Sequence, residues 1–270
     1  MKVPFTKAHG AKNDFLLTWS DEAPPAHFEA LARAICDRHT GIGADGWLLV
    51  SRPRPGSASH GSIRLYNPDA SEAEISGNGT RCAAAFLIDA GLAEDEVRIE
   101  TGAGLKSLRL LAREGLLFTF EMNMGSPSYR REELACELPL RGGAREVTIL
   151  NVGNPQCAVQ VQNLDFDWRA VGAEIERHPR FPSRTNVSFY RARDERTIEA
   201  RFFERGAGET MSSGTGSTGA AAAAILRGVV KSPVRVLTPA GPLDLRWEGA
   251  DVILVGPAEI VARGEFYFPG

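Results

Sequence analysis

The sequence predicts an α+β fold of two similar halves, each a curled, mostly antiparallel sheet or barrel around one buried helix. The main observation is an internal repeat, in which residues 76–91 match residues 213–228 without a gap. The matched positions include a leading Ser, two loop glycines, three alanines, an Ile and a closing Gly. The same spacing also pairs Arg64 with Arg201, Glu72 with Glu209, and the tetrapeptide at 101–104 with that at 238–241. A repeat of this length indicates an internally duplicated protein.

Each copy of the repeat predicts a glycine-rich turn that opens a helix. Small and hydroxylated residues at the start are suited to cap the helix, and Gly91 and Gly228 are suited to end it. Both helix bodies are apolar on nearly every face, which is typical of a helix buried all round. Its first turn presents unpaired N–H groups and the positive end of the dipole, which favours a bound anion. For a single copy, glycines that only permit a tight turn would explain the pattern equally well. The duplication favours two anion-binding ends.

The first half is expected to span residues 1–118, completed by the C-terminal tail 263–270. Apolar positions at helical spacing predict a helix over 26–37. A stretch rich in Pro, Gly and Ser at 52–61 predicts an exposed turn. Short apolar or alternating runs predict strands at 3–8, 15–19, 47–50, 63–66, 97–100, 105–111 and 116–121, with a turn over 9–14 between the first two.

The second half is expected to span residues 119–262. It begins with a polar stretch at 125–143, which contains two prolines and connects the halves. A short helix is predicted at 171–177, and strands are predicted at 147–150, 157–161, 185–189, 197–203 and within 234–261. Polar residues from both halves are expected to gather where the halves meet, which is a common place for ligand sites.

Composition excludes several classes of protein. The 270 residues are 43% hydrophobic and 24% charged, as in ordinary soluble domains. A net charge of −3 with mixed signs argues against nucleic acid or an anionic membrane as partner. The four cysteines show no metal-ligand spacing and no C-x-x-C pair, so no metal site is expected. Together with the lack of an apolar leader, they predict a cytoplasmic protein with reduced thiols. The oligomeric state stays open, a homodimer included.

Separated motifs along both halves carry a resemblance to a known family. They are His9-Gly10-x-x-Asn13-Asp14-Phe15, Asp37-Arg38-His39-x-Gly41-Ile42-Gly43-x-Asp45, Asn67-x-Asp69-x-Ser71-Glu72, Gly77-Asn78-Gly79-x-Arg81-Cys82, Gly153-Asn154-Pro155, Glu204-Arg205-Gly206-x-Gly208-Glu209-Thr210 and Gly214-Thr215-Gly216. In this order they make the chain resemble the diaminopimelate epimerases over nearly its whole length. The resemblance implies the two-half fold of that family.

The resemblance further implies an isomerase that uses no pyridoxal phosphate or other cofactor. Such an enzyme inverts the α-carbon of a small amino acid, converting LL-diaminopimelate to the meso form for lysine and peptidoglycan synthesis. In the family, two side chains on opposite faces of the α-carbon work as a pair: one removes the proton as a thiolate and the other returns one as a thiol. Two helix N-termini would stabilise charge developing on the α-carboxylate and would lower the pKa of a nearby thiol.

The same resemblance implies the residues of the site. Ser76 and Ser213 occupy the two acid/base positions. Side chains that would bind the substrate are those of Asn13, Asn67, Asn154, Asn186, Glu204 and Arg205, and backbone N–H groups that would hold its carboxylate are those of Gly77, Asn78, Gly214 and Thr215. Taken alone, each Asn is compatible with an ordinary turn and the Glu-Arg pair with a surface ion pair. Their joint order favours the site.

The chain departs from the family at the acid/base positions. Ser76 and Ser213 stand where the family has cysteines, while Cys82 and Cys157 match family cysteines outside the catalytic pair. Gln156 replaces a common His, and Gly46 stands where a Gln helps to shape the pocket. A thiol has a reference pKa of about 8.5, whereas a serine hydroxyl is far less acidic and needs an adjacent base.

Several functions are compatible with these serines. They are serine-based proton transfer, aided by Glu204, Glu72 or Glu74; a substituted form that binds an amino acid without turnover; and a changed reaction, as in dehydratases related to the proline racemases. A nucleotide site is a further alternative, because Gly214-x-Gly216-x-x-Gly219 fits dinucleotide spacing. It lacks a βαβ context and an acidic partner residue, which argues against it.

Overall fold

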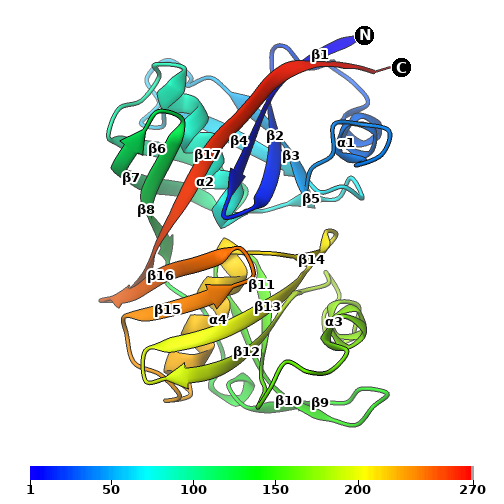
Figure 1. Ribbon diagram of the computed structural model, residues 1–270, viewed down its shortest axis with the longest axis vertical. Helices are drawn as coiled ribbons and strands as arrows, with labels where there is room; N and C mark the ends of the chain where they lie inside the picture. The colour runs from blue at the N-terminus through cyan, green and yellow to red at the C-terminus, as the bar shows by residue number, and fades with distance from the viewer. Residues whose placement is uncertain (269–270) are drawn as a thin grey trace. The chain divides into compact units, whose positions relative to one another are not determined.

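Residues 1–268, which the computed structural model describes, form strands and helices in an order that repeats along the chain (Figure 1). The helices are α1 (Phe28–Cys36), α2 (Gly77–Asp89), η1 (Arg131–Glu133, a 3₁₀ helix), α3 (Trp168–Glu176) and α4 (Gly214–Leu226). The strands are β1 (Lys2–Gly10), β2 (Asn13–Trp19), β3 (Gly46–Ser51), β4 (Gly61–Tyr66), β5 (Glu72–Ala73), β6 (Glu96–Thr101), β7 (Gly104–Glu114), β8 (Leu117–Gly125), β9 (Cys136–Leu138), β10 (Arg145–Asn151), β11 (Pro155–Gln160), β12 (Asn186–Asp194), β13 (Thr197–Glu204), β14 (Gly208–Thr210), β15 (Val234–Thr238), β16 (Gly241–Glu248) and β17 (Asp251–Tyr267).

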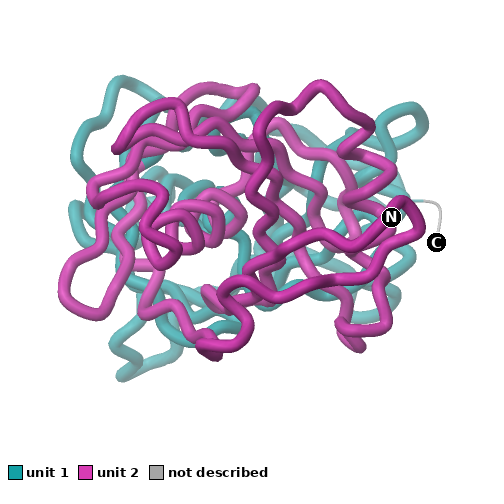
Figure 2. Tube along the Cα trace, turned by 90° about the horizontal axis from the view of Figure 1, so that it is seen from below, with its two compact units in different colours: residues 1–122, 256–270 teal, residues 123–255 magenta. Residues whose placement is uncertain are grey.

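The chain divides into two units, coloured separately in Figure 2. Unit 1 comprises Met1–Met122 together with the chain from Gly256 onward, and unit 2 comprises Asn123–Val255. Both divisions fall inside strands, the first within β8 and the second within β17. The domain boundaries expected from the sequence, after residue 118 and after residue 262, remain a prediction, and the last two residues of the expected tail 263–270 lie outside the described part.

Unit 1 is a sheet that closes on itself around α2. Hydrogen-bonded neighbours follow the order β1, β2, β3, β4, β6, β7, β8 and β17, and β17 pairs back to β1. The β2–β3 and β4–β6 pairs are parallel. The pairs β1–β2, β3–β4, β6–β7, β7–β8 and β1–β17 are antiparallel. Every residue of α2 from Gly77 to Ile88 is buried, which confirms the helix surrounded by sheet.

Helix α1 packs on the outer side of this sheet. It begins at Phe28, two residues later than the sequence predicts, because Pro24 and Pro25 precede it and His27 adopts a left-handed conformation at its start. Its buried side chains Leu31 and Ile35 join a cluster with Trp47 and Tyr66. This is the apolar helical face that the spacing predicts.

Unit 2 repeats the arrangement around α4. Its pairs run β10–β11, β11–β12, β12–β13, β13–β15, β15–β16 and β16–β17, with β11–β12 and β13–β15 parallel. Residues Gly214–Ala224 of α4 are all buried. Helix α3 takes the place that α1 has in the other unit, and Trp168 and Ile175 pack against Phe189. The α+β fold of two similar halves is therefore confirmed.

The repeat is also exact in its caps and turns. Helices α2 and α4 begin and end at equivalent residues, and Gly91 (φ 71°) and Gly228 (φ 70°) close them in the left-handed conformation. The paired tetrapeptides form one and the same hairpin turn, in which Thr101 Oγ1 donates to Gly104 O and Thr238 Oγ1 donates to Gly241 O. The spacing seen in the sequence thus reports shared backbone geometry.

Short elements in the connections were not predicted. The stretch 125–143 contains η1 and β9, and β5 and β14 are strands of two and three residues. Strands this short carry no readable alternation, so tertiary pairing decides them. No helix within residues 1–268 is both long and apolar enough to cross a membrane.

Candidate active site

In unit 1 the candidate site is built on the first turn of α2. Ser76 has an extended backbone, and its Oγ accepts a hydrogen bond from Gly79 N at 3.1 Å. The cap predicted from the sequence is therefore present. Within this unit no acceptor for the hydroxyl hydrogen of Ser76 lies at hydrogen-bonding distance among residues 1–268. The hydroxyl is thus free to donate to a ligand.

A chain of amides fixes the first residues of α2. Asn78 Nδ2 donates to Asn13 Oδ1 at 3.1 Å, and Asn13 Nδ2 donates to Asp45 Oδ2 at 2.7 Å. The turn between β1 and β2 is narrower than expected: only Ala11 and Lys12 lie outside the strands, both with positive φ. Asn13 is therefore the first residue of β2 and is buried against the helix start.

Charges surround the far end of this chain. Asp45 and Asp14 lie on either side of Arg38, whose Nη2 is 2.7 Å from a carboxylate oxygen of each. Burial raises the pKa of Asp45, and the charge of Asp14 adds to the effect. Burial also acts on Asp14, but hydrogen bonds from Arg38 and Lys7 outweigh it and lower the pKa of Asp14. Arg38 thus holds both carboxylates in place, and Asp45 accepts the hydrogen bond from Asn13.

Arg81, one turn into α2, is fully buried. Its guanidinium donates to three oxygens, Pro257 O at 3.0 Å, Gly77 O at 3.3 Å and Asn78 Oδ1 at 2.5 Å. Within residues 1–268 no carboxylate lies at ion-pair distance from it. Burial lowers the pKa of Arg81 to about 10. A buried charge without a counter-charge is rare, and Arg81 places one behind the α2 N-terminus.

Close backbone packing makes this arrangement possible. A Cβ on Gly10 of β1 would lie 3.1 Å from Asn78 Cα and 3.2 Å from Arg81 Nη2. Only glycine lets β1 approach the start of α2 so closely. The other predicted residue of this unit, Asn67, is buried in the turn between β4 and β5, where its Nδ2 donates to Ser71 Oγ at 2.9 Å. Its role in substrate binding stays a prediction.

In unit 2 the first turn of α4 has the same cap but a different neighbour. Ser213 Oγ accepts from Gly216 N at 2.9 Å and donates to Glu204 Oε2 at 3.0 Å. The other oxygen of Glu204 accepts from Thr210 Oγ1 at 2.6 Å. Glu204 ends β13, and Thr210 ends β14 in the hairpin that follows, so strand pairing sets the position of the carboxylate. A serine hydroxyl is therefore joined directly to a potential base.

Amides again support the helix start in unit 2. Asn154 Nδ2 lies 3.4 Å from Thr215 Oγ1, and Gln156 Nε2 donates to Asn154 Oδ1 at 2.6 Å. A Cβ on Gly219 would lie 3.0 Å from Gln156 Cγ, so glycine makes room for this longer side chain. Asn186 accepts from Arg205 N at 3.1 Å and donates to Pro155 O at 3.0 Å. Gln156 thus orients Asn154, and Asn186 orients Arg205.

The predicted site residues therefore form two groups, each within its own unit. Unit 1 brings together Ser76, Gly77, Asn78 and Asn13, and unit 2 brings together Ser213, Gly214, Thr215, Asn154, Asn186, Glu204 and Arg205. Sequence reasoning assigned no role to Asp45, Arg81 or Thr210, although all three stand in the quoted motifs. Arg81 and Thr210 each stand in one motif with a candidate binding residue, whereas Asp45 stands in a motif that contains none.

The three buried cysteines are unsuited to supply a thiolate. All four are free, and Cys82 and Cys157 are fully buried. Burial raises the pKa of Cys82 to about 12, raises that of Cys36 to about 12, and raises the pKa of Cys157 further. A thiol with such a pKa carries almost no thiolate at neutral pH. Within residues 1–268 no group of three or more His, Cys, Asp or Glu is placed to hold a metal ion.

Comparison with known proteins agrees with this geometry. The family model described as diaminopimelate epimerase matches residues 5–130 and 148–261. A diaminopimelate epimerase from Pelotomaculum thermopropionicum is 41% identical, with 97% of this chain and 98% of the relative covered. One from Burkholderia thailandensis is 38% identical, with both chains covered in full, at 100%.

Solved structures share the fold at lower identity. A hydroxyproline epimerase from Agrobacterium vitis superposes with a TM-score of 0.77 at 17% identity, covering 98% of this chain and 92% of that one. A phenazine biosynthesis protein of the PhzF family from Bacillus anthracis gives 0.69 at 17% identity, covering 99% and 100%. The family match spans both units and includes both serine-capped helix starts. The chain belongs to the diaminopimelate epimerase family and is an isomerase of the epimerase class.

Proposed function

We propose that this protein epimerises diaminopimelate, interconverting the LL and meso forms without pyridoxal phosphate or another cofactor. The names of its relatives support this substrate, which would place the enzyme in lysine and peptidoglycan precursor synthesis. The observation that carries the proposal is the hydrogen bond from Ser213 Oγ to Glu204 Oε2 at 3.0 Å. It supplies the adjacent base that a serine needs for proton transfer. We place the enzyme in the cytoplasm, in keeping with four free thiols.

Ser213 and Glu204 act together as the base in this proposal. As the Cα–H bond of the substrate breaks, Ser213 Oγ takes the proton and passes its own proton to Glu204 Oε2. The electron pair of the broken bond delocalises into the substrate's α-carboxylate. Backbone N–H groups of Gly214 and Thr215, at the positive end of α4, are suited to stabilise that charge.

Ser76 returns a proton to the α-carbon. Its hydroxyl hydrogen has no acceptor within its unit, and the positive charge of Arg81 lies behind the same helix turn. Both features favour the loss of a proton, because the alkoxide left behind would be stabilised by the N–H groups of Gly77 and Asn78 and by the dipole of α2. In the reverse reaction the two serines exchange roles.

The remaining predicted residues bind the substrate's other groups in this proposal. Asn13, Asn67 and Asn154 offer amide groups, and Arg205 offers a guanidinium for a carboxylate. Asn186 contributes by holding the backbone N–H of Arg205. The serines are expected to make turnover slower than with thiols, because an alkoxide is a costlier intermediate than a thiolate.

Exchange of the α-proton with solvent tests the proposal. Incubation of LL-diaminopimelate with the protein in D₂O is expected to add one mass unit per reacting centre and to yield the meso form. The variant Ser213→Ala is expected to abolish both signals. Exchange no faster than in the Ser213→Ala variant, at high protein concentration and saturating substrate, would refute the proposal. Binding without exchange would identify an amino-acid-binding protein instead.

A further inference from the structure

Glu176 is a buried carboxylate in an unfavourable position. It is the last residue of α3, and its side chain is 1% exposed. The C-terminal end of a helix repels negative charge, so an acidic residue at this point destabilises the helix unless cations compensate it. Two arginines do so: Arg177 Nε lies 3.2 Å from Glu176 Oε2, and Arg184 Nη2 pairs with Glu176 Oε1. These two ion pairs therefore compensate a carboxylate at a helix end that would otherwise disfavour it.

Arg184 closes the loop that leads from α3 to β12. Its φ of 61° lies in the left-handed region, which a non-glycine residue rarely adopts. Arg184 N donates to Phe181 O at 2.9 Å, and Thr185 N donates to Glu176 O at 3.3 Å. The ion pair and these two bonds fix the last turn of the loop against the end of α3. Strain of this kind persists where the surrounding structure determines it and is frequent at functional sites.

This last turn holds Arg205, which the proposed function assigns to substrate binding. The carbonyl oxygen of Ser183 accepts from Arg205 Nη1 at 3.1 Å. The side chain of Asn186, two residues beyond Arg184, accepts from Arg205 N at 3.1 Å. Both the guanidinium and the backbone of Arg205 are therefore attached to the segment that Glu176 and Arg184 fix.

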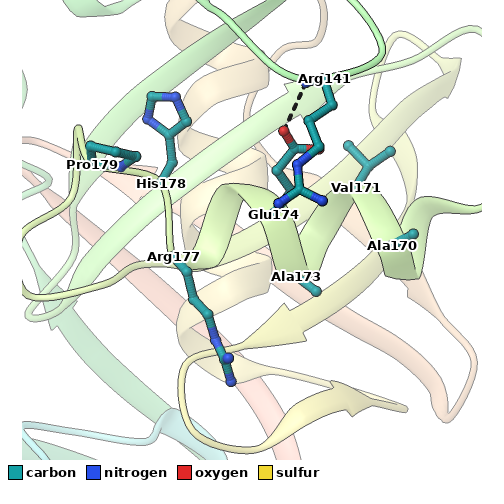
Figure 3. A pocket seen from close by; sticks show the side chains of 8 residues that line it. All are labelled: Arg141, Ala170, Val171, Ala173, Glu174, Arg177, His178 and Pro179. Carbon is teal, nitrogen blue, oxygen red and sulfur yellow. Dashed lines mark hydrogen bonds between the residues drawn. The ribbon is translucent and has the colours of Figure 1, made fainter.

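The outer side of the same loop borders a hollow of about 690 Å³ (Figure 3). Arg177, His178 and Pro179 line it together with residues of α3. Glu174, also on α3, accepts there from Arg141 N at 2.8 Å, the contact drawn as a dashed line in Figure 3. The loop also has contacts outside α3, because His178 Nε2 lies 3.0 Å from Pro139 O and Arg180 Nη2 lies 2.9 Å from Glu133 Oε1. The ion pair between buried Glu176 and half-buried Arg184 adds a contact from the end of α3.

We propose that Glu176 and Arg184 are positioning residues, which hold Ser183 and Asn186 so that Arg205 is oriented toward the substrate. Neither residue of the pair needs to touch the substrate. This inference rests on the proposed function, because it takes Arg205 as a substrate-binding residue. It predicts that breaking the pair weakens substrate binding and leaves the proton transfer itself largely intact.

Two single variants test the pair, and a third is the control. Glu176→Gln removes the charge and keeps the shape, and Arg184→Gly removes the partner while glycine adopts the positive φ without strain. Each is expected to raise the KM for LL-diaminopimelate about tenfold and to change kcat less than twofold. Glu174→Gln, on the same helix and engaged only in the outer contact, is the control and should leave both constants unchanged. If Glu176→Gln fails to fold, Arg184→Gly tests the same pair. A wild-type KM in Arg184→Gly would overturn the inference.

A double-mutant cycle separates positioning from a general structural effect. In the presence of Arg205→Met, Glu176→Gln is expected to add no further loss of binding, because its effect acts through Arg205. Additive losses would overturn the inference.

A measurement made without substrate distinguishes a failure of the positioning role from a failure of the proposed function. In ¹⁵N spectra, Glu176→Gln is expected to shift the backbone amide and Nε signals of Arg205, and Glu174→Gln is not. If the wild type exchanges no α-proton, the proposed function fails while these spectra still test the pair. Unshifted Arg205 signals in Glu176→Gln would refute the positioning role.

Discussion

The starts of α2 and α4 have the same backbone and opposite surroundings. Both are capped by a serine whose Oγ accepts from the N–H three residues later, and the helices begin and end at equivalent positions. Behind the cap, α2 has the buried cation Arg81, whereas Thr218 stands at the equivalent position of α4. Beside the cap, Ser213 has the carboxylate of Glu204, whereas the equivalent position in unit 1 is Asn67.

In the proposed mechanism, this difference gives the two copies of the repeat different roles. Backbone geometry supplies the same anion-binding turn twice, and single side chains then set the local potential. A carboxylate raises the proton affinity of a neighbouring group, and a cation lowers it. Under the proposed function, we therefore expect Ser213 to take a proton and Ser76 to give one.

The largest expected effect on the exchange rate comes from replacing both capping serines with cysteines. The double variant Ser76→Cys, Ser213→Cys is expected to raise the rate of α-proton exchange roughly 10³-fold, since helix N-termini stabilise thiolates that serve as better acids and bases. Mass-detected exchange in D₂O measures it. A rate no higher than that of the wild type would mean that the surrounding residues serve a different substrate.

Removing the carboxylate beside Ser213 is expected to have the second largest effect. Glu204→Gln keeps an oxygen that can accept from Ser213 but cannot take up a proton, so the exchange rate is expected to fall about 10²-fold. Glu209→Gln is the matched control, because Glu209 lies in the same hairpin and pairs with Arg169. Equal losses in both variants would remove Glu204 from the proposed base.

Replacing the cation behind Ser76 is expected to have a smaller effect. Arg81→Lys keeps the charge but cannot reach Pro257 O, Gly77 O and Asn78 Oδ1 together, so Asn78 loses its orientation. Calorimetry should show about tenfold weaker binding of diaminopimelate. Arg109→Lys, which alters an exposed pair with Glu121, is the control. Unchanged affinity in Arg81→Lys would show that Asn78 is oriented by Asn13 alone.

The smallest effect is a difference between two single-cysteine variants. The pKa of a thiol at position 76 should be lower than that of a thiol at position 213, because Arg81 stabilises a thiolate and Glu204 destabilises it. As pH falls through 7, alkylation by iodoacetamide should therefore persist longer in Ser76→Cys, which should react several-fold faster at pH 6. In the wild type, burial holds the pKa of Cys82 at about 12, so it should stay unmodified at pH 8. Equal pH profiles of alkylation in the two variants would contradict the proposed difference in thiol pKa between positions 76 and 213.

Much of the fold was predictable because it rests on local patterns. The repeat predicted both buried helices and the glycines that end them, and apolar runs located most strands. Helix α1 began later than predicted because two prolines and the left-handed His27 delay it. The strands β5 and β14 depend on partners in β4 and β13 and leave no local signal.

The candidate site was predictable in its residue types and not in its contacts. Motif order pointed to Asn13, Asn154, Glu204 and both serines. The hydrogen bond from Ser213 to Glu204 depends on the register of β13 with β14, and the isolation of Arg81 from carboxylates depends on what packs around α2. Neither can be read from spacing.

The sequence by itself determined the duplication, the hydroxylated helix starts, the buried helices and the family, because each depends on residue type and local spacing. Only the tertiary structure decided that one serine has a base beside it and the other a cation behind it. Those relations join residues far apart in the chain or on neighbouring strands, and electrostatic interactions depend on the distance between charges in the folded protein and on how far they are shielded from water.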